Sequence, residues 1–230
     1  MKFKLPPVYP ITDKRLSGKP NHLAIVRELV RGGASVVQIR DKETPVRTLL
    51  EDIRRCVDFA GPLGVTVIVN DRCDLALLSG AAGAHLGQDD LPPDAARRVL
   101  PKGAVLGFST HSMAEVREAD PLPVQYIGFG PVFATSTKAS ASPVAGLRGL
   151  RRACRESAHP VVAIGGIGLE QLRVVLEAGA VSAAVISSLM QAGNLARRME
   201  QFLKVARQVQ PLARQTGPDD LHGFRYRCRP

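Results

Sequence analysis

Short apolar segments alternate with longer amphipathic segments along most of the chain, and this alternation limits the fold more than any other feature. Eight apolar segments of four residues, many of them β-branched, lie at 8–11, 36–39, 66–69, 83–86, 105–108, 126–129, 161–164 and 183–186. Such segments are typical of parallel strands that are buried on both faces. The amphipathic segments between them carry apolar residues at helical spacing and therefore predict helices.

Eight strands that alternate with helices predict an α/β fold, and specifically a (β/α)8 TIM barrel of parallel strands. The length of 230 residues suits one such domain. An open, doubly wound sheet is the alternative, although no G-x-G-x-x-G follows the first apolar segment, which disfavours it. We expect a single barrel domain over residues 1–210. Residues 211–230 contain Pro, Gly and charged residues without apolar periodicity, so we expect a flexible tail there.

Composition narrows the class of partner. The net charge of +10 could attract nucleic acid, a membrane surface or phosphorylated metabolites. Nucleic acid is disfavoured because the chain has no Trp, only three Tyr and no motif that mixes aromatic and basic residues. There is no membrane-spanning segment and no signal-peptide core, so we expect a cytoplasmic protein. The four cysteines lack metal-ligand spacing.

The carboxyl ends of the strands form the active site of a barrel of this class, so the polar residues that follow each apolar segment matter most. Gln38, Arg40 and Lys42 are two residues apart at the end of the second segment, and in extended chain they point the same way. Two cations facing one cavity are costly unless an anion lies between them. The residues therefore indicate an anion site, with a solvated strand end as the alternative.

Two aspartates follow neighbouring strands. Asp71 follows the third apolar segment, and Asp90 follows the fourth after a short loop. Carboxylates from adjacent strand ends could share Mg²⁺, which takes one or two carboxylates and completes its shell with water and phosphate oxygens. Turn and helix-cap chemistry is the alternative explanation for both aspartates.

The remaining strand ends indicate a second anion site. Ser109 ends the fifth strand and could hydrogen-bond a small heterocycle. The loop 130–138 is rich in hydroxyls and ends in Lys138, which suits an anion, although a mobile polar loop is the alternative. Gly165-Gly166 and Ser187-Ser188 end the seventh and eighth strands, where barrels of this class often bind phosphate.

These motifs together resemble the thiamine-phosphate synthase family, from about residue 9 to residue 188. The matching pieces are YPITD (9–13), VQIRDK (37–42), VNDR (69–72), HLGQDDL (85–91), GFS (107–109), GFGPVFATSTK (128–138) and AIGGI (163–167). The resemblance implies a transferase of thiamine biosynthesis. It would join 4-amino-2-methyl-5-hydroxymethylpyrimidine diphosphate to a thiazole phosphate, release pyrophosphate and form thiamine monophosphate by a dissociative substitution.

The resemblance also implies a role for each matching residue. The pyrimidine diphosphate would be held by Gln38, Ile39, Arg40, Asp41, Lys42, Asn70, Ser109 and Lys138. Among these, Arg40, Lys42, Lys138 and Ser109 would carry the catalysis, and Asp71 and Asp90 would bind the Mg²⁺ cofactor. The thiazole phosphate would be held by Thr135, Ser136, Thr137, Gly166, Ile186 and Ser187.

Two alternatives stay open from the sequence. A thiazole tautomerase-like relative shares the fold but should not need the set of residues that holds the diphosphate and the metal. A non-catalytic barrel that binds a phosphate as a regulator would share the anion sites. The expected partners are two phosphorylated heterocyclic substrates, without nucleic acid or membrane, and a homo-oligomer is left open.

Overall fold

Eight parallel strands form a single sheet that closes on itself in the computed structural model, which describes residues 3–135 and 143–209. The strands are β1 (Val8–Pro10), β2 (Val36–Ile39), β3 (Thr66–Asn70), β4 (Gly83–Leu86), β5 (Val105–Thr110), β6 (Tyr126–Phe129), β7 (Val161–Ala163) and β8 (Ser182–Val185). Their order is β1-β8-β7-β6-β5-β4-β3-β2. A parallel bridge between Ile11 and Gln38 joins the first and last strands of this order. The predicted barrel is confirmed, and the open sheet is wrong.

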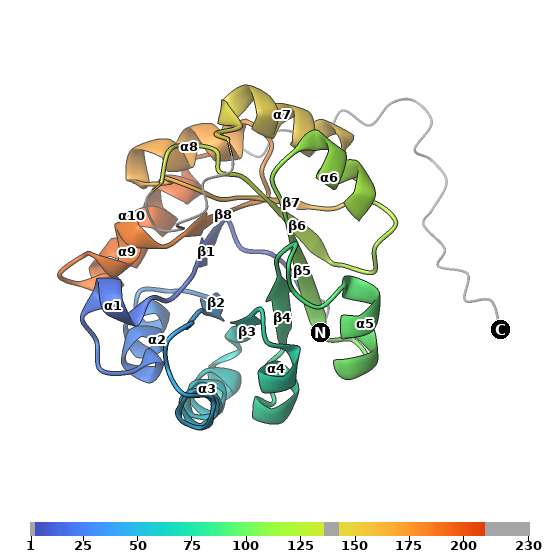
Figure 1. The fold of residues 1–230 in the computed structure, drawn as a ribbon. Helices are drawn as coiled ribbons and strands as arrows, with labels where there is room; N and C mark the ends of the chain where they lie inside the picture. Colours follow the sequence, from blue (N-terminus) through green and yellow to red (C-terminus); the bar gives the residue numbers. More distant parts are fainter. Residues whose placement is uncertain (1–2, 136–142, 210–230) are drawn as a thin grey trace.

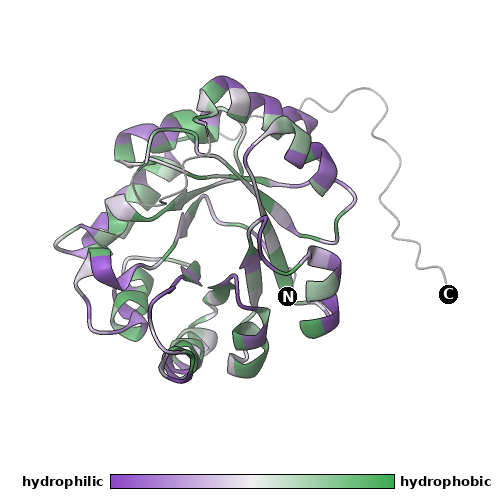
Figure 2. Cartoon of the chain, viewed as in Figure 1, coloured by the Kyte–Doolittle hydropathy of each residue, from purple (hydrophilic) through white to green (hydrophobic). Residues whose placement is uncertain are grey.

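A ring of helices surrounds the strands (Figure 1). The helices are α1 (Lys14–Ser17), α2 (His22–Arg31), α3 (Val46–Ala60), α4 (Cys73–Ser79), α5 (Pro93–Val99), α6 (Met113–Ala119), α7 (Gly146–Glu156), α8 (Leu169–Glu177), α9 (Ser187–Met190) and α10 (Leu195–Arg207), with a 3-10 turn at Gly61–Leu63. Hydrophilic and hydrophobic residues alternate along the outer helices, as amphipathic segments require (Figure 2).

Side chains alternate between two cores along each strand. The larger core lies between the strands and the helices, and Val37 and Ile39 of β2 belong to it. A smaller cluster fills the barrel itself and includes Tyr9, Val36 and Tyr126. Because successive side chains of a strand point to opposite faces, the phase that sends Val36 inward also sends Gln38 toward the barrel axis.

The expected tail at 211–230 lies outside the described residues. Within residues 3–135 and 143–209, no helix combines the length and hydropathy needed to cross a membrane.

Candidate functional site

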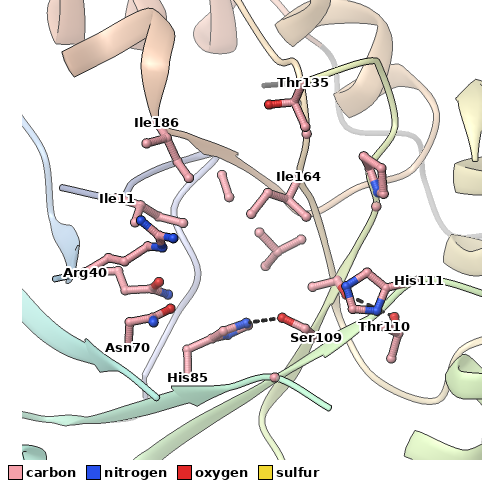
Figure 3. Close-up of a pocket in the computed structure, with 18 of the residues that line it drawn as sticks. Ile11, Arg40, Asn70, His85, Ser109, Thr110, His111, Thr135, Ile164 and Ile186 are labelled. Carbon is pink, nitrogen blue, oxygen red and sulfur yellow. Dashed lines mark hydrogen bonds between the residues drawn. The ribbon is translucent and has the colours of Figure 1, made fainter. Parts of the chain in front are cut away.

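A cavity of about 530 Å³ opens at the carboxyl ends of the strands. Each of the eight strands, or the loop that follows it, contributes to its lining. Figure 3 shows Arg40 and Asn70 on one side of this cavity and Thr135 on another, with His85 and Ser109 between Asn70 and the far side. The position agrees with the general location of active sites in barrels of this class.

Cations and amides gather on the β2–β3 side. Gln38, Arg40, Lys42 and Asn70 all line the cavity there. Lys42 Nζ lies 3.2 Å from Asp71 Oδ2, and Arg40 Nη1 lies 3.7 Å from Asp13 Oδ2. These residues provide two cationic groups, each beside a carboxylate, together with amide hydrogen-bond donors, and such donors suit a phosphate or diphosphate group.

The carboxyl groups of Asp71 and Asp90 face the same cavity. Asp71 follows β3 with a left-handed φ of 63°, which is uncommon for a residue with a side chain. Burial raises the pKa of Asp71, and the neighbouring Asp90 carboxyl raises it further, while Lys42 opposes the shift. Asp90 Oδ2 accepts a 2.6 Å hydrogen bond from Gly87 N. The loop 87–90 therefore positions the Asp90 carboxylate next to that of Asp71.

This arrangement fits a hard divalent cation. Two close carboxylates repel each other, and a cation between them would remove that cost. Among the described residues, no group of three or more His, Cys, Asp or Glu side chains is placed to hold a metal ion. Asp71 and Asp90 would thus supply only part of a coordination shell, as is usual for Mg²⁺ that takes its other ligands from water and substrate phosphate.

Two glycines that follow β7 line another edge of the cavity. Gly165 and Gly166 have φ values of 98° and 63°, and a Cβ at Gly166 would lie 2.5 Å from Ala134 O. Only glycine allows this left-handed backbone and this close approach. Ile186 and Ser187 border the cavity where β8 ends. Glycine is therefore needed at both positions for packing against the loop 131–134, and the same two residues line the cavity.

The structure brings most of the predicted site residues to this one cavity. The described residues that do so are Gln38, Arg40, Lys42, Asn70, Asp71, Asp90, Ser109, Thr135, Gly166, Ile186 and Ser187. Ser136, Thr137 and Lys138 lie outside the described residues.

Two predicted side chains do not reach the cavity. Ile39 is 1% exposed and points into the outer core, because it alternates with its inward neighbours on β2. The Asp41 carboxylate accepts hydrogen bonds from Thr44 and pairs with Lys14 and His22. Although burial raises the pKa of Asp41, these hydrogen bonds outweigh it and hold the pKa well below its usual range. Asp41 therefore acts on the shape of the loop after β2.

Two tyrosines in the cavity floor were missed by sequence reasoning. Tyr9 and Tyr126 line the cavity while they belong to the inner core. The sequence does contain a signal for both, because the alternation of side chains along β1 and β6 predicts that Tyr9 and Tyr126 point into the barrel. His85 is hydrogen-bonded to Tyr126 and Ser109 and also lines the cavity.

Comparison with known proteins gives a consistent result. Residues 8–189 match the family model described as thiamine monophosphate synthase. The thiamine-phosphate synthase of Azorhizobium caulinodans is 39% identical over 203 residues, which cover 87% of this chain and 96% of that protein. That of Syntrophomonas wolfei is 43% identical over 198 residues, covering 85% and 95% of the two chains. The solved structure of thiamine phosphate pyrophosphorylase from Pyrococcus furiosus is 35% identical, with a TM-score of 0.80 over 87% of this chain and 95% of that one.

Proposed function

This chain belongs to the thiamine monophosphate synthase family, and from that premise we propose that its cavity joins a pyrimidine diphosphate to a thiazole phosphate. The bond from the pyrimidine methylene carbon to the diphosphate oxygen breaks, and pyrophosphate leaves with the bonding electrons. The thiazole nitrogen then donates its lone pair to that carbon, and thiamine monophosphate forms.

One observation carries the proposal: two acidic and two basic side chains meet at one side of a cavity whose other side is lined by glycine backbone. Asp71 and Asp90 face the cavity beside Arg40 and Lys42. A diphosphate carries enough negative charge to need both cations and a divalent ion. Gly165 and Gly166 line the cavity without side chains, which suits the smaller monophosphate of the second substrate.

Asp71 and Asp90 would hold Mg²⁺, which supplies charge neutralisation for the departing pyrophosphate. Arg40 and Lys42 line the same cavity and would act on the same charge, as preorganised cations beside the place where the leaving group develops its negative charge. Gln38 and Asn70 line the cavity together with these cations, where they can orient the pyrimidine.

The chemistry requires orientation more than acid–base assistance. An electron-rich aminopyrimidine stabilises positive charge on its methylene carbon, so no protein nucleophile is needed. The thiazole nitrogen already carries a lone pair, so no strong base is needed. The protein contributes mainly by placing the two substrates together and by stabilising the leaving charge.

The set of side chains on the β2–β3 side favours synthesis over the two alternatives. A thiazole tautomerase-like barrel should not need a diphosphate and metal set, yet Lys42, Asn70 and Asp71 line the cavity together. A regulatory barrel would need only one of the two anion sites.

The test is to mix both substrates with Mg²⁺ and the purified chain, and to measure thiamine monophosphate and pyrophosphate. We expect the two products in equal amounts, and a loss of both in Arg40→Ala. Binding of both substrates without product would overturn the proposal and favour the regulatory barrel.

A further inference from the structure

An unbroken chain of hydrogen bonds crosses the cavity floor and joins five strands. Gln38 Nε2 donates to Tyr9 Oη at 3.2 Å, and Tyr9 Oη lies 2.8 Å from Tyr126 Oη. Tyr126 Oη lies 3.1 Å from His85 Nδ1, and His85 Nε2 lies 2.9 Å from Ser109 Oγ. Figure 3 shows the last of these bonds, with the two side chains pointing toward each other.

The packing around this chain fixes its geometry. The His85 and Tyr126 rings are stacked with centroids 5.4 Å apart, and the Tyr9 ring meets Tyr126 edge-on at 5.8 Å. A Cβ at Gly107 would lie 2.2 Å from Tyr126 Cζ and 2.4 Å from His85 Nδ1, so glycine is required where these two rings meet β5. The members of the chain therefore have little freedom to choose other partners.

The amide of Gln38 determines which atom is the donor and which the acceptor in every bond of this hydrogen-bond chain. An amide nitrogen can only donate, so Tyr9 accepts from it. Among the residues that the structure describes, the Tyr9 hydroxyl has hydrogen bonds only with Gln38 and Tyr126. Its proton is therefore donated to Tyr126. Tyr126 in turn donates to His85 Nδ1. The ring proton of His85 is then on Nε2, and it is donated to Ser109 Oγ.

Both phenols keep their protons under ordinary conditions. Burial raises the pKa of Tyr9 to about 12 and raises the pKa of Tyr126 well above its ordinary value. Each hydroxyl is therefore one donor and one acceptor, as the one-way chain requires. Leaving either proton without an acceptor in this buried place would cost a full desolvation penalty.

We propose that this chain makes Ser109 an obligate hydrogen-bond donor to the bound ring. The Ser109 oxygen already accepts from His85, so its own proton is free to point into the cavity that Ser109 lines. The ligand must then present an acceptor there, such as a ring nitrogen of the pyrimidine. Tyr9, Tyr126 and His85 are positioning residues for this donor. The inference about the ring rests on the proposed function, whereas the donor-to-acceptor order from Gln38 to Ser109 does not.

The donor-to-acceptor order of these hydrogen bonds can be measured without substrate, from the tautomer of His85. Long-range ¹H–¹⁵N spectra of protein with ¹⁵N-labelled histidine distinguish the two neutral imidazole tautomers. Five histidines contribute signals, and those of His85 are assigned by their loss in His85→Gln. We expect His85 to carry its proton on Nε2. If the Gln38 oxygen faced Tyr9 instead, all protons would reverse, so an Nδ1–H signal or a mixture of both tautomers would overturn the proposal.

Two matched variants each remove one buried hydroxyl. In Tyr126→Phe, His85 Nδ1 loses its donor, so we expect both tautomers of His85. In Tyr9→Phe, Tyr126 can still donate to His85, so we expect the Nε2–H tautomer to persist. A tautomer change in Tyr9→Phe would mean that the chain runs the other way. Each variant is compared with the parent by circular dichroism, and the parent spectrum decides the direction even if one variant fails to fold.

The role toward the ring is tested by binding. Two pyrimidine diphosphate analogues, each with one ring nitrogen replaced by C–H, are titrated in the presence of Mg²⁺ against the parent and against Ser109→Ala. We expect one analogue to bind about tenfold more weakly than the natural ring, and this difference to disappear in Ser109→Ala. If neither analogue shows such coupling, Ser109 is not a donor to the ring, whereas formation of thiamine monophosphate by the parent would still support the proposed function.

Discussion

Lys42 Nζ and Asp71 Oδ2 lie 3.2 Å apart, so a cation from the end of β2 is paired with a carboxylate from the end of β3. Lys42 keeps 56% of its side chain exposed in this pair, and it lowers the pKa of Asp71 against the effects of burial and of Asp90. The pair links the proposed diphosphate site to the proposed metal site through adjacent strands. Changes at Asp71 should therefore be visible both in metal dependence and in stability.

The substitution Asp71→Asn should weaken the response to Mg²⁺. The amide keeps the size of the side chain and tolerates the left-handed backbone at this position, but it removes the negative charge. We expect the Mg²⁺ concentration for half-maximal product formation to rise roughly tenfold or more, as for the loss of a charged ligand contact. Asp74→Asn on α4 is the control, because Asp74 pairs with Arg72 instead. A Mg²⁺ titration that overlays that of the parent would contradict the metal assignment.

The same substitution should raise stability at neutral pH when no divalent ion is present. The folded protein holds the Asp71 proton more tightly than the unfolded chain does, because burial and Asp90 raise its pKa. Stability therefore falls as the pH rises from the ordinary aspartate pKa of about 3.9 through the folded pKa. We expect a higher melting temperature for Asp71→Asn at pH 7.5 in EDTA, and no difference near pH 3.

Asp74→Asn serves as a control of opposite sign for this measurement. The hydrogen bond from Arg72 lowers the pKa of Asp74, so its ionised form stabilises the folded state above the ordinary pKa. Asp74 is exposed, and the change should be small. If Asp71→Asn also lowered the melting temperature at pH 7.5, the two carboxylates would not oppose each other in the folded protein.

Gly166→Ala should damage binding of the thiazole phosphate specifically. Its Cβ would lie 2.5 Å from Ala134 O, and φ is 63°. We expect the KM for the thiazole phosphate to rise about tenfold or more, with little change in the KM for the pyrimidine diphosphate. Gly80→Ala has a similar φ of 72° but no atom within 4 Å of the added Cβ, so it measures the backbone cost by itself. Equal effects of both variants on the KM would contradict a phosphate site at Gly166.

Lys138→Ala should slow the reaction by roughly 10²–10³-fold, as for the loss of one preorganised electrostatic contact. Lys138 lies outside the described residues, and the expectation comes from its place in the motif GFGPVFATSTK. Lys102→Ala changes an exposed lysine in the loop before β5 and should leave the rate unchanged. Single-turnover measurements with both substrates saturating would test this, and equal rates for the two variants would remove Lys138 from the catalytic set.

Removal of residues 211–230 should leave the activity intact. The described residues that line the cavity end at Ser187, well before this segment. The truncated chain and the full chain should therefore give the same kcat/KM for both substrates. A large loss in the truncated chain would mean that the segment contributes to the cavity mouth.

The barrel and most of its site could be predicted from the sequence, because both depend on local periodicity. Apolar segments locate the strands, and their period of two places Gln38 and Arg40 on the same inward face. Parallel strands share one carboxyl edge, so residues such as Asn70 and Ser109, far apart in the chain, must meet there once the fold is known. The same period also places Ile39 outward, although the family resemblance had assigned it to the substrate.

Other relationships depend on the closed tertiary structure. Asp41 pairs with His22 of α2 and Lys14 of α1. The sequence around Asp41 contains no local pattern that predicts these partners. The contact between Tyr9 and Tyr126 joins residues 117 positions apart across the barrel. Such contacts form only when β1 closes on β2 and the inward side chains of distant strands meet at the axis. The sequence by itself therefore determined the barrel and most of the residues that face its cavity. The tertiary structure decided the partners of those residues, because hydrogen-bond partners depend on distances across the barrel that local periodicity does not contain.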